Sequence, residues 1–317
     1  MHDVREQAAR WLARGDRVAL ATVVATRRSA PRPVGSKLIV SEQGELFGSV
    51  SGGCVESDVA AQAVEVIADG ESRLLTYGIS DDEAWEVGLP CGGEIDVFVQ
   101  RLDREPPDGE GVLVTVLEGG GAGAQELLSR GALEPGVHEL EGTRVFAEVL
   151  GPPPRLLVVG ATDTAEELCR AAGALGWRTT VIDPRPRLAT EERLPSADEL
   201  LVGWPDELQA DADTAVVVLT HEERLDVPAL TAALASDAYY VGAIGSRRTQ
   251  EKRRERLLDA GVAEEALERL AGPAGLDLGA ETPAETAISI LAEILAVRGG
   301  RSGSRLVERS GPIHAST

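Results

Sequence analysis

Two short elements that combine glycine with cysteine are the first candidates for chemistry in this sequence. The first, Gly52-Gly53-Cys54, precedes Glu56 at the point where a strand-like run turns into a helical pattern. The first N–H groups of a helix are unpaired and partly positive, so this position favours an anion or a thiolate, and glycines let a ligand approach the backbone. We expect these residues to contact a ligand. The structural alternative is a tight turn around a small cysteine.

The second element, Cys91-Gly92-Gly93, mirrors the first and leads into a strand predicted at 95–99. Two such elements in one region favour a shared site. A structural zinc ion normally takes about four side-chain ligands, and neither a histidine nor a further cysteine stands near these elements in the sequence. The pattern therefore disfavours a zinc centre. The remaining cysteine, Cys169, falls inside a helical pattern and is typical of core filler.

A glycine loop in the second half, residues 160–165, follows an apolar strand and precedes a helical pattern. Asp183 ends the next strand, at about the twenty-residue spacing of the acid that holds a ribose in dinucleotide-binding folds. Thr162, however, replaces the second glycine of the G-x-G-x-x-G fingerprint, and Asp163 brings negative charge to the phosphate end. The loop is an incomplete fingerprint, which disfavours tight binding of NAD(P).

The charge balance excludes some partners and leaves others open. The formal net charge of −22 would repel nucleic acid and anionic membrane surfaces, because both require a basic face. Positive residues nevertheless cluster at 27–37, which includes Lys37, and at 247–254, which begins with Arg247 and Arg248. These clusters either receive an anionic ligand or partner, or form solvated surface.

Apolar runs alternate with helical patterns through the second half, which predicts a doubly wound, Rossmann-like parallel sheet in an α/β fold. Strands are expected at 156–159, 179–182, 200–202, 215–219 and 240–244. The carboxyl ends of parallel strands share one edge, so Gly160, Asp183, His221 and Gly245-Ser246 should gather there. This edge is the expected ligand crevice.

Two helix starts can be placed within this domain. Thr164, with Glu167 three residues later, is a candidate capping box for the helix at 165–175. Thr282 followed by Pro283 begins the last helix. The apolar face of that helix should run through Ile290, Ile294 and Val297.

The first half is typical of a smaller α+β domain. We expect a helix at 4–14, a strand at 18–24 and paired strands at 38–40 and 45–47. A further helical pattern places Val59, Ala63, Val66 and Ile67 on one face. The break at 152–154, a run of three prolines, separates domains at 1–151 and 155–298, and the tail at 299–317 is expected to be disordered.

Length and composition agree with this division. A chain of 317 residues favours two domains of about 150 residues each. The N-terminus lacks the pattern of a secretory signal, and no run of eighteen apolar residues occurs. We therefore expect a cytoplasmic protein that does not enter a membrane, with its three cysteines as free thiols.

Taken together, these motifs closely resemble those of the XdhC/CoxI family, accessory proteins for the maturation of molybdenum hydroxylases such as xanthine dehydrogenase. In the first half the resemblance rests on residues 30–37, 48–56 and 88–93. In the second half it rests on 181–185, 219–221, 240–249 and 275–280.

The resemblance implies a chaperone and not an enzyme. Such a protein binds molybdenum cofactor (molybdopterin) transiently, protects it while a cysteine desulfurase partner installs its terminal sulfur, and passes it to the apo-hydroxylase. Cys54 and Cys91 would contact or shield the molybdenum centre. The full set of candidate cofactor-binding residues is Lys37, Gly52, Gly53, Cys54, Glu56, Cys91, Gly92, Gly93, Gly160, Asp183, Arg185, His221, Gly245, Ser246, Arg247 and Arg248.

Two other functions stay open at this point. An NAD(P)-dependent oxidoreductase would place Asp183 on a ribose and use His221 as a proton donor, although His221 can equally order the turn in which it stands. A transferase would carry sulfur on Cys54. A second copy of the chain, in a homodimer, is a further candidate partner.

Overall fold

The structure is a computed structural model that describes residues 2–28, 30–78, 93–308 and 310. The chain divides into two compact units, with the division in sequence between Pro152 and Pro153. We refer to them as unit 1 and unit 2. Among the described residues, no helix has both the length and the apolar character required to cross a lipid bilayer.

Unit 2 is built on a parallel sheet with the strand order β12-β11-β10-β13-β14-β15. This is the doubly wound order of a Rossmann fold, in which the chain reverses direction across the sheet between β10 and β13. The strands are β10 (Arg155–Val159), β11 (Arg178–Ile182), β12 (Glu199–Leu201), β13 (Thr214–Val218), β14 (Tyr240–Ala243) and β15 (Leu270–Ala271).

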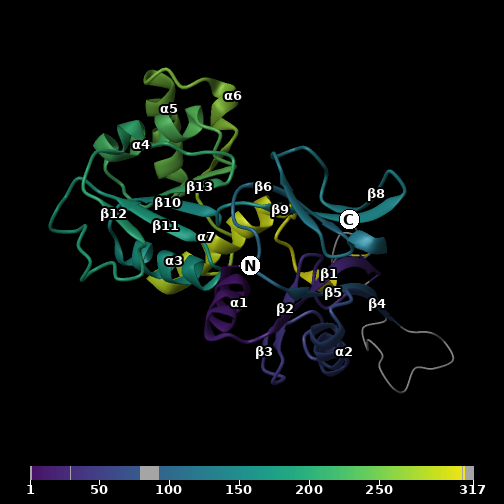
Figure 1. The fold of residues 1–317 in the computed structure, drawn as a ribbon. Coiled ribbons are helices and arrows are strands. Elements are labelled where there is room, and N and C mark those ends of the chain that lie inside the picture. The colour runs from purple at the N-terminus through teal and green to yellow at the C-terminus, as the bar shows by residue number, and fades with distance from the viewer. Residues whose placement is uncertain (1, 29, 79–92, 309, 311–317) are drawn as a thin grey trace. The chain divides into compact units, whose positions relative to one another are not determined.

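Helices cover both faces of this sheet (Figure 1). They are α3 (Asp163–Ala174), α4 (Glu223–Ala235), α5 (Arg247–Asp259), α6 (Glu264–Leu267) and α7 (Pro283–Arg298). Buried residues of α3 and α7 pack on one face, and those of α4, α5 and α6 pack on the other. Both faces are buried, which is why the central strands β10 and β13 are almost entirely apolar with no polar alternation. The predicted α/β class is confirmed.

The two predicted helix starts have different outcomes. The start of α7 is as expected, because Thr282 and Glu285 form a capping box before Pro283. The start of α3 is not at Thr164: Thr162 has the extended backbone of an N-cap, and its side chain accepts a hydrogen bond from the N–H of Ala165. Thr164 already lies inside the helix, where its backbone N–H is part of the first turn.

One core prediction for α7 is also wrong. Ile290 and Ile294 are fully buried, whereas Val297 is 47% exposed. Val297 lies in the last turn, beyond the last α7 residue of the core cluster. Further along the chain, residues Leu306–Glu308 form a short 3-10 turn.

The described residues of unit 1 form two antiparallel sheets. The first sheet has the order β3-β2-β1-β5-β4, and the second sheet has the order β7-β6-β9-β8. The strands are β1 (Val18–Arg27), β2 (Lys37–Ser41), β3 (Leu46–Gly48), β4 (Arg73–Tyr77), β5 (Glu94–Leu102), β6 (Gly111–Val116), β7 (Gln125–Leu128), β8 (Gly136–Leu140) and β9 (Thr143–Leu150).

The first sheet of unit 1 is covered on both faces. Helix α2 (Glu56–Asp69) packs on one face through Val59, Ala63, Val66 and Ile67, as the sequence predicted. Alternate residues of β1 point to the opposite face, where Leu20 packs against helix α1 (His2–Arg14). On that same face Val24 packs against Phe146 of the second sheet. The core of unit 1 therefore continues from one sheet to the other.

Gly160 provides a test of how tightly the edge of the sheet in unit 2 is packed. Its φ is +109°, and an added Cβ would lie 2.4 Å from Cγ2 of Thr220. We predict that Gly160→Ala lowers the free energy of unfolding by about 2 kcal/mol or more, through backbone strain and overpacking. Urea unfolding followed by circular dichroism measures the change.

The matched control for this substitution is Gly173→Ala. Gly173 is exposed in α3, and its added Cβ would meet no atom within 4 Å beyond its chain neighbours and the backbone of its own helix. This variant should gain about 0.5 to 1 kcal/mol, because alanine restricts the unfolded chain and favours the helix. Equal stability of the two variants would contradict the packing described for Gly160.

Candidate functional site

The Gly-Gly-Cys loop, residues 49–55, connects β3 to α2 and folds around the carboxylate of Glu56. This carboxylate accepts hydrogen bonds from the backbone N–H groups of Val50 (3.2 Å), Ser51 (2.8 Å) and Gly53 (2.7 Å). It also accepts from the hydroxyls of Ser49 (2.7 Å) and Ser51. The N–H groups expected to hold a ligand anion therefore hold an anion of the chain itself.

The serine hydroxyls of the loop engage its other N–H groups. Ser51 Oγ accepts from the N–H groups of Cys54 and Val55, each at 2.9 Å, and Ser49 Oγ accepts from the N–H of Gly52 at 2.8 Å. Each N–H from Val50 to Val55 thus has an acceptor inside the loop. What the loop presents outward is the exposed Cys54 thiol, with no atom near the Cα face of Gly52 or Gly53.

The ionisation of Glu56 reflects these contacts. Partial burial acts to raise its pKa, but the hydrogen bonds from Ser51, Ser49 and the loop backbone outweigh it and lower the pKa from 4.5 to about 2. Glu56 therefore stays charged at any physiological pH. Its carboxylate organises the loop, and contact of Glu56 with a ligand stays a prediction.

The partner element of this loop lies largely outside the described residues. Cys91 and Gly92 fall in the range 79–92, and only Gly93, buried just before β5, is described. The predicted convergence of the two glycine–cysteine elements therefore stays a prediction.

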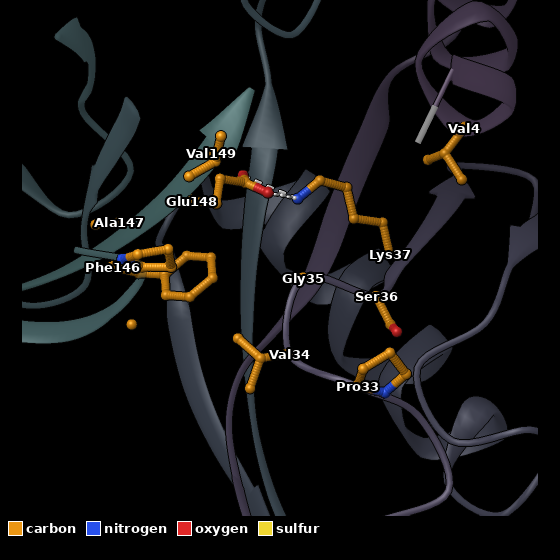
Figure 2. A pocket seen from close by; sticks show the side chains of 12 residues that line it. Val4, Pro33, Val34, Gly35, Ser36, Lys37, Phe146, Ala147, Glu148 and Val149 are labelled. Atoms are coloured by element: carbon orange, nitrogen blue, oxygen red, sulfur yellow. Dashed lines mark hydrogen bonds and ion pairs between the residues drawn. The ribbon is translucent and has the colours of Figure 1, made fainter. Parts of the chain in front are cut away.

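Lys37, from the basic cluster of unit 1, forms an ion pair with Glu148 of β9. Its Nζ lies 2.9 Å from Oε1 and 2.7 Å from Oε2 of that carboxylate. Both side chains line a cavity of about 490 Å³ (Figure 2). Lys37 therefore meets an acid of its own chain, and the pair is exposed to the cavity.

In unit 2, Asp183 closes the glycine loop in the same manner as Glu56. Its fully buried carboxylate accepts hydrogen bonds from the N–H of Ala161 (2.8 Å) and from the N–H (2.9 Å), Nε (2.8 Å) and Nη2 (2.6 Å) of Arg185. Burial raises the pKa of Asp183, but the bonds from Arg185 and Ala161 prevail and lower it. Both carboxylate oxygens of Asp183, which were expected to hold a ribose, therefore accept hydrogen bonds from the chain itself.

Arg185 also connects neighbouring strand ends. It pairs with Glu222, which stands next to the exposed His221 after β13. The carboxyl edge thus brings Gly160, Asp183, Arg185 and the turn at His221 into one set of contacts, as expected for a parallel sheet.

A buried network beneath this edge was not predicted. Arg253 is 3% exposed, and its guanidinium donates to Asp226 (2.7 Å), to the carbonyl of Ile244 (3.0 Å) and to Gln250 (2.6 Å). Asp226 in turn accepts from the Thr220 hydroxyl. Arg253 is therefore not part of a basic surface. The sequence offers one signal, because Asp226 and Arg253 each stand four residues before a leucine, Leu230 and Leu257, and so share a helix face with it.

Two exposed arginines of this edge lie at the start of α5. Gly245 precedes Ser246, which caps the helix by accepting from the N–H of Thr249 at 3.2 Å. Arg247 and Arg248 are exposed, and neither side chain has a hydrogen bond or ion pair with the rest of the described chain. These residues could receive an anion. A cluster of three or more histidine, cysteine or carboxylate ligands for a metal ion is absent from the described residues.

The fold and these sites define a two-unit α/β protein whose Rossmann domain has its glycine loop closed by an internal carboxylate. The model of the XdhC Rossmann domain matches residues 156–294, and that of the XdhC and CoxI family matches 11–78. The Escherichia coli molybdenum cofactor insertion chaperone PaoD is 30% identical over 295 residues, which cover 90% of this chain and 84% of that protein. The chain belongs to the XdhC and CoxI family, and the predicted resemblance is confirmed.

Two further comparisons also span most of the chain. A Bacillus subtilis protein, named as a probable subunit of xanthine dehydrogenase, is 28% identical over 313 residues, which cover 88% of this chain and 92% of that protein. A crystal structure described as a xanthine dehydrogenase from Bacillus halodurans has 25% sequence identity and a TM-score of 0.77. The match covers 95% of this chain and 98% of that one.

The role assigned to Glu56 predicts a specific dependence of stability on pH. Because its folded-state pKa of about 2 lies below the ordinary 4.5, its contribution to stability is complete above pH 4.5 and is lost as the pH falls towards 2. We predict that Glu56→Gln unfolds at a lower temperature than the wild type at pH 7, and that this difference shrinks between pH 4.5 and 2.

Thermal unfolding across that pH range measures the difference. Glu71→Gln, at an exposed position just after α2, is the control and should follow the wild type. A constant difference between Glu56→Gln and the wild type at every pH would contradict the role of the Glu56 carboxylate.

The two described cysteines should differ in reactivity. Cys54 is exposed, whereas Cys169 is buried, and burial raises the pKa of its thiol to about 12. We predict that iodoacetamide at pH 8 alkylates Cys54 in the folded protein and reaches Cys169 only after unfolding. Peptide mass spectrometry over time gives the two rates, and similar rates would show that the Cys54 loop is wrongly described.

Proposed function

We propose that this protein is a chaperone that binds molybdenum cofactor and inserts it into a molybdenum hydroxylase such as xanthine dehydrogenase. The observation that carries the proposal is the similarity to PaoD, a named insertion chaperone, across 90% of this chain. The similarity extends over both units, so it is not limited to the widespread Rossmann fold.

The site chemistry is consistent with such a cargo. Molybdenum cofactor combines a pterin, a phosphate and a metal centre with sulfur ligands. Unit 1 offers an exposed thiol, Cys54, on a loop that is already ordered by Glu56. Unit 2 offers Arg247 and Arg248 at a helix N-terminus, where backbone dipole and side-chain charge both favour a phosphate.

The finer steps of the proposal concern timing and partners. The protein would hold the cofactor transiently while a cysteine desulfurase supplies the terminal sulfur, and would then meet the apo-hydroxylase. Cys54 would contact the metal centre and shield it during this interval, together with Cys91, and the protein could act as a homodimer. In this scheme the protein carries a cargo and has no substrate to turn over.

The oxidoreductase alternative gains no support from the glycine loop. Binding of NAD(P) would use the N–H of Ala161 near the phosphates and the carboxylate of Asp183 on the ribose, but these two groups bond each other. Arg185 takes the remaining acceptor positions of Asp183. The first turn of α3 also carries Asp163 and Glu166, which oppose a phosphate.

Cofactor retention and delivery test the proposal directly. We predict that the purified protein retains molybdenum cofactor on a desalting column, activates an apo-hydroxylase in a defined mixture, and oxidises no hydroxylase substrate alone. Cys54→Ser and the double variant Arg247→Gln/Arg248→Gln should each weaken retention about tenfold or more, because each removes charged or metal-directed contacts.

The control for these variants is Lys252→Gln, since Lys252 is exposed on the same helix α5. It should retain the cofactor as the wild type does. If the wild-type protein itself neither retains the cofactor nor activates the apo-hydroxylase, the proposed function is wrong. If only the variants are unaffected, the function stands and these residues lie outside the binding site.

A further inference from the structure

The cavity between the two sheets of unit 1 has the size and lining of a small-molecule site. Its volume of about 490 Å³ lies within the range usual for ligand pockets, about 300 to 1,000 Å³. Figure 2 shows residues that line it. They come from α1, from strands β8 and β9, and from the segment that leads into β2. Most of the lining is apolar: Val4, Pro33, Val34, Pro135, Phe146, Ala147 and Val149.

One corner of this cavity is polar, and it is formed by Lys37 and Glu148. Their side chains are only 10% and 9% exposed. An ammonium group has three N–H donors and a carboxylate has about four acceptor positions. The two bonds between them leave one donor on Lys37 and two acceptor positions on Glu148 without a partner among the described residues. The pair therefore offers a ligand one N–H donor, on Lys37, beside two acceptor positions, on Glu148.

This combination selects one class of ligand. A simple anion would be repelled by Glu148, and a simple cation by Lys37. A purely apolar molecule would fill the walls but leave the buried donor and acceptors unpaired, which costs free energy. A flat heterocycle that carries a carbonyl oxygen next to N–H groups satisfies both side chains, because the carbonyl accepts from Lys37 and the N–H groups donate to Glu148.

The walls suit such a ring as well. Phe146 offers an aromatic side chain, and Pro33 and Val34 offer flat or branched apolar contacts on the loop before β2. A purely structural link between the sheets would need no charge, because a buried ion pair is seldom more stabilising than apolar residues of similar volume. The charges of this pair therefore suggest recognition.

We propose that this cavity binds the amino-carbonyl edge of a pterin ring, with Glu148 accepting from the ring amino and N–H groups and Lys37 donating to the ring carbonyl. Guanine presents the same edge, so the choice of a pterin rests on the proposed function, in which the cargo contains one. Glu148 sets the specificity, because it requires donors at this edge.

The test compares ligands that differ only at that edge. The probes are 6-hydroxymethylpterin and 6-hydroxymethyllumazine, in which a carbonyl replaces the amino group, and binding to the full-length protein is followed by ligand fluorescence. We expect saturable binding of the pterin, at least about tenfold tighter than that of the lumazine, because the second carbonyl would face Glu148. No preference, or no pterin binding, overturns the proposal without any variant being made.

Variants then assign the preference to Glu148. Glu148→Gln should reduce the pterin-to-lumazine ratio to near one, since an amide can donate or accept. The control Glu126→Gln, at an exposed position in β7 of the same sheet, should keep the wild-type ratio. An unchanged ratio in folded Glu148→Gln overturns the assignment. Guanosine serves as a further probe, and binding as tight as that of the pterin overturns the choice of ring.

These outcomes are separable from those for the proposed function. If the protein delivers molybdenum cofactor to an apo-hydroxylase but shows no preference between the two probes, the cavity proposal fails and the function stands. If the protein prefers the pterin but delivers no cofactor, the cavity proposal is supported and the proposed function fails.

Discussion

A carboxylate that accepts the backbone N–H groups of a glycine loop is the interaction on which both units depend. Backbone N–H groups turned inward must find acceptors, because an unpaired one costs about 1 to 3 kcal/mol. In unit 1 Glu56 accepts three of them, and in unit 2 Asp183 accepts that of Ala161 and the backbone N–H of Arg185. Each loop is therefore ordered before any ligand arrives. This distinguishes the chain from a dinucleotide-binding protein, in which the ligand phosphate takes that place.

The closed loops determine what is left for recognition. The backbone donors of the unit 1 loop are all hydrogen-bonded, so this loop presents the Cys54 thiol from an ordered backbone. The edge of unit 2 presents the side chains of Arg247 and Arg248. The proposed function requires that the bound cofactor can be released, and contacts from exposed side chains suit such a release. A ligand held by many preformed backbone N–H groups would dissociate slowly, whereas a ligand held by a few exposed side chains can pass to a second protein.

Much of the fold could be predicted from local pattern, and much of the site could not. The strands of unit 2 follow from apolar runs, and the buried face of α2 follows from helical spacing. The sequence does not predict that Glu56 and Asp183 accept from the glycine loops, because spacing identifies an anion-binding turn but not which anion binds there. Lys37 and Glu148 are 111 residues apart, and no local pattern connects two strands of different sheets. The sequence favours Thr164 as the cap of α3 because Thr164 and Glu167 have the spacing of a capping box, whereas the cap in the structure is Thr162.

Two buried ion pairs of this chain show why burial alone does not define a ligand site. Arg253 and Asp226 are buried and bond Thr220, Gln250 and the carbonyl of Ile244, and these contacts hold the ends of β13 and β14 to α4 and α5. Lys37 and Glu148 bond only each other among the described residues and border a cavity. Removing one member of either pair would cost stability, because one buried charge would lose its partner. The Lys37–Glu148 pair lines a cavity with free hydrogen-bonding positions, whereas the Arg253–Asp226 pair connects strand ends to helices. That difference separates a structural contact from a place where a ligand can be recognised.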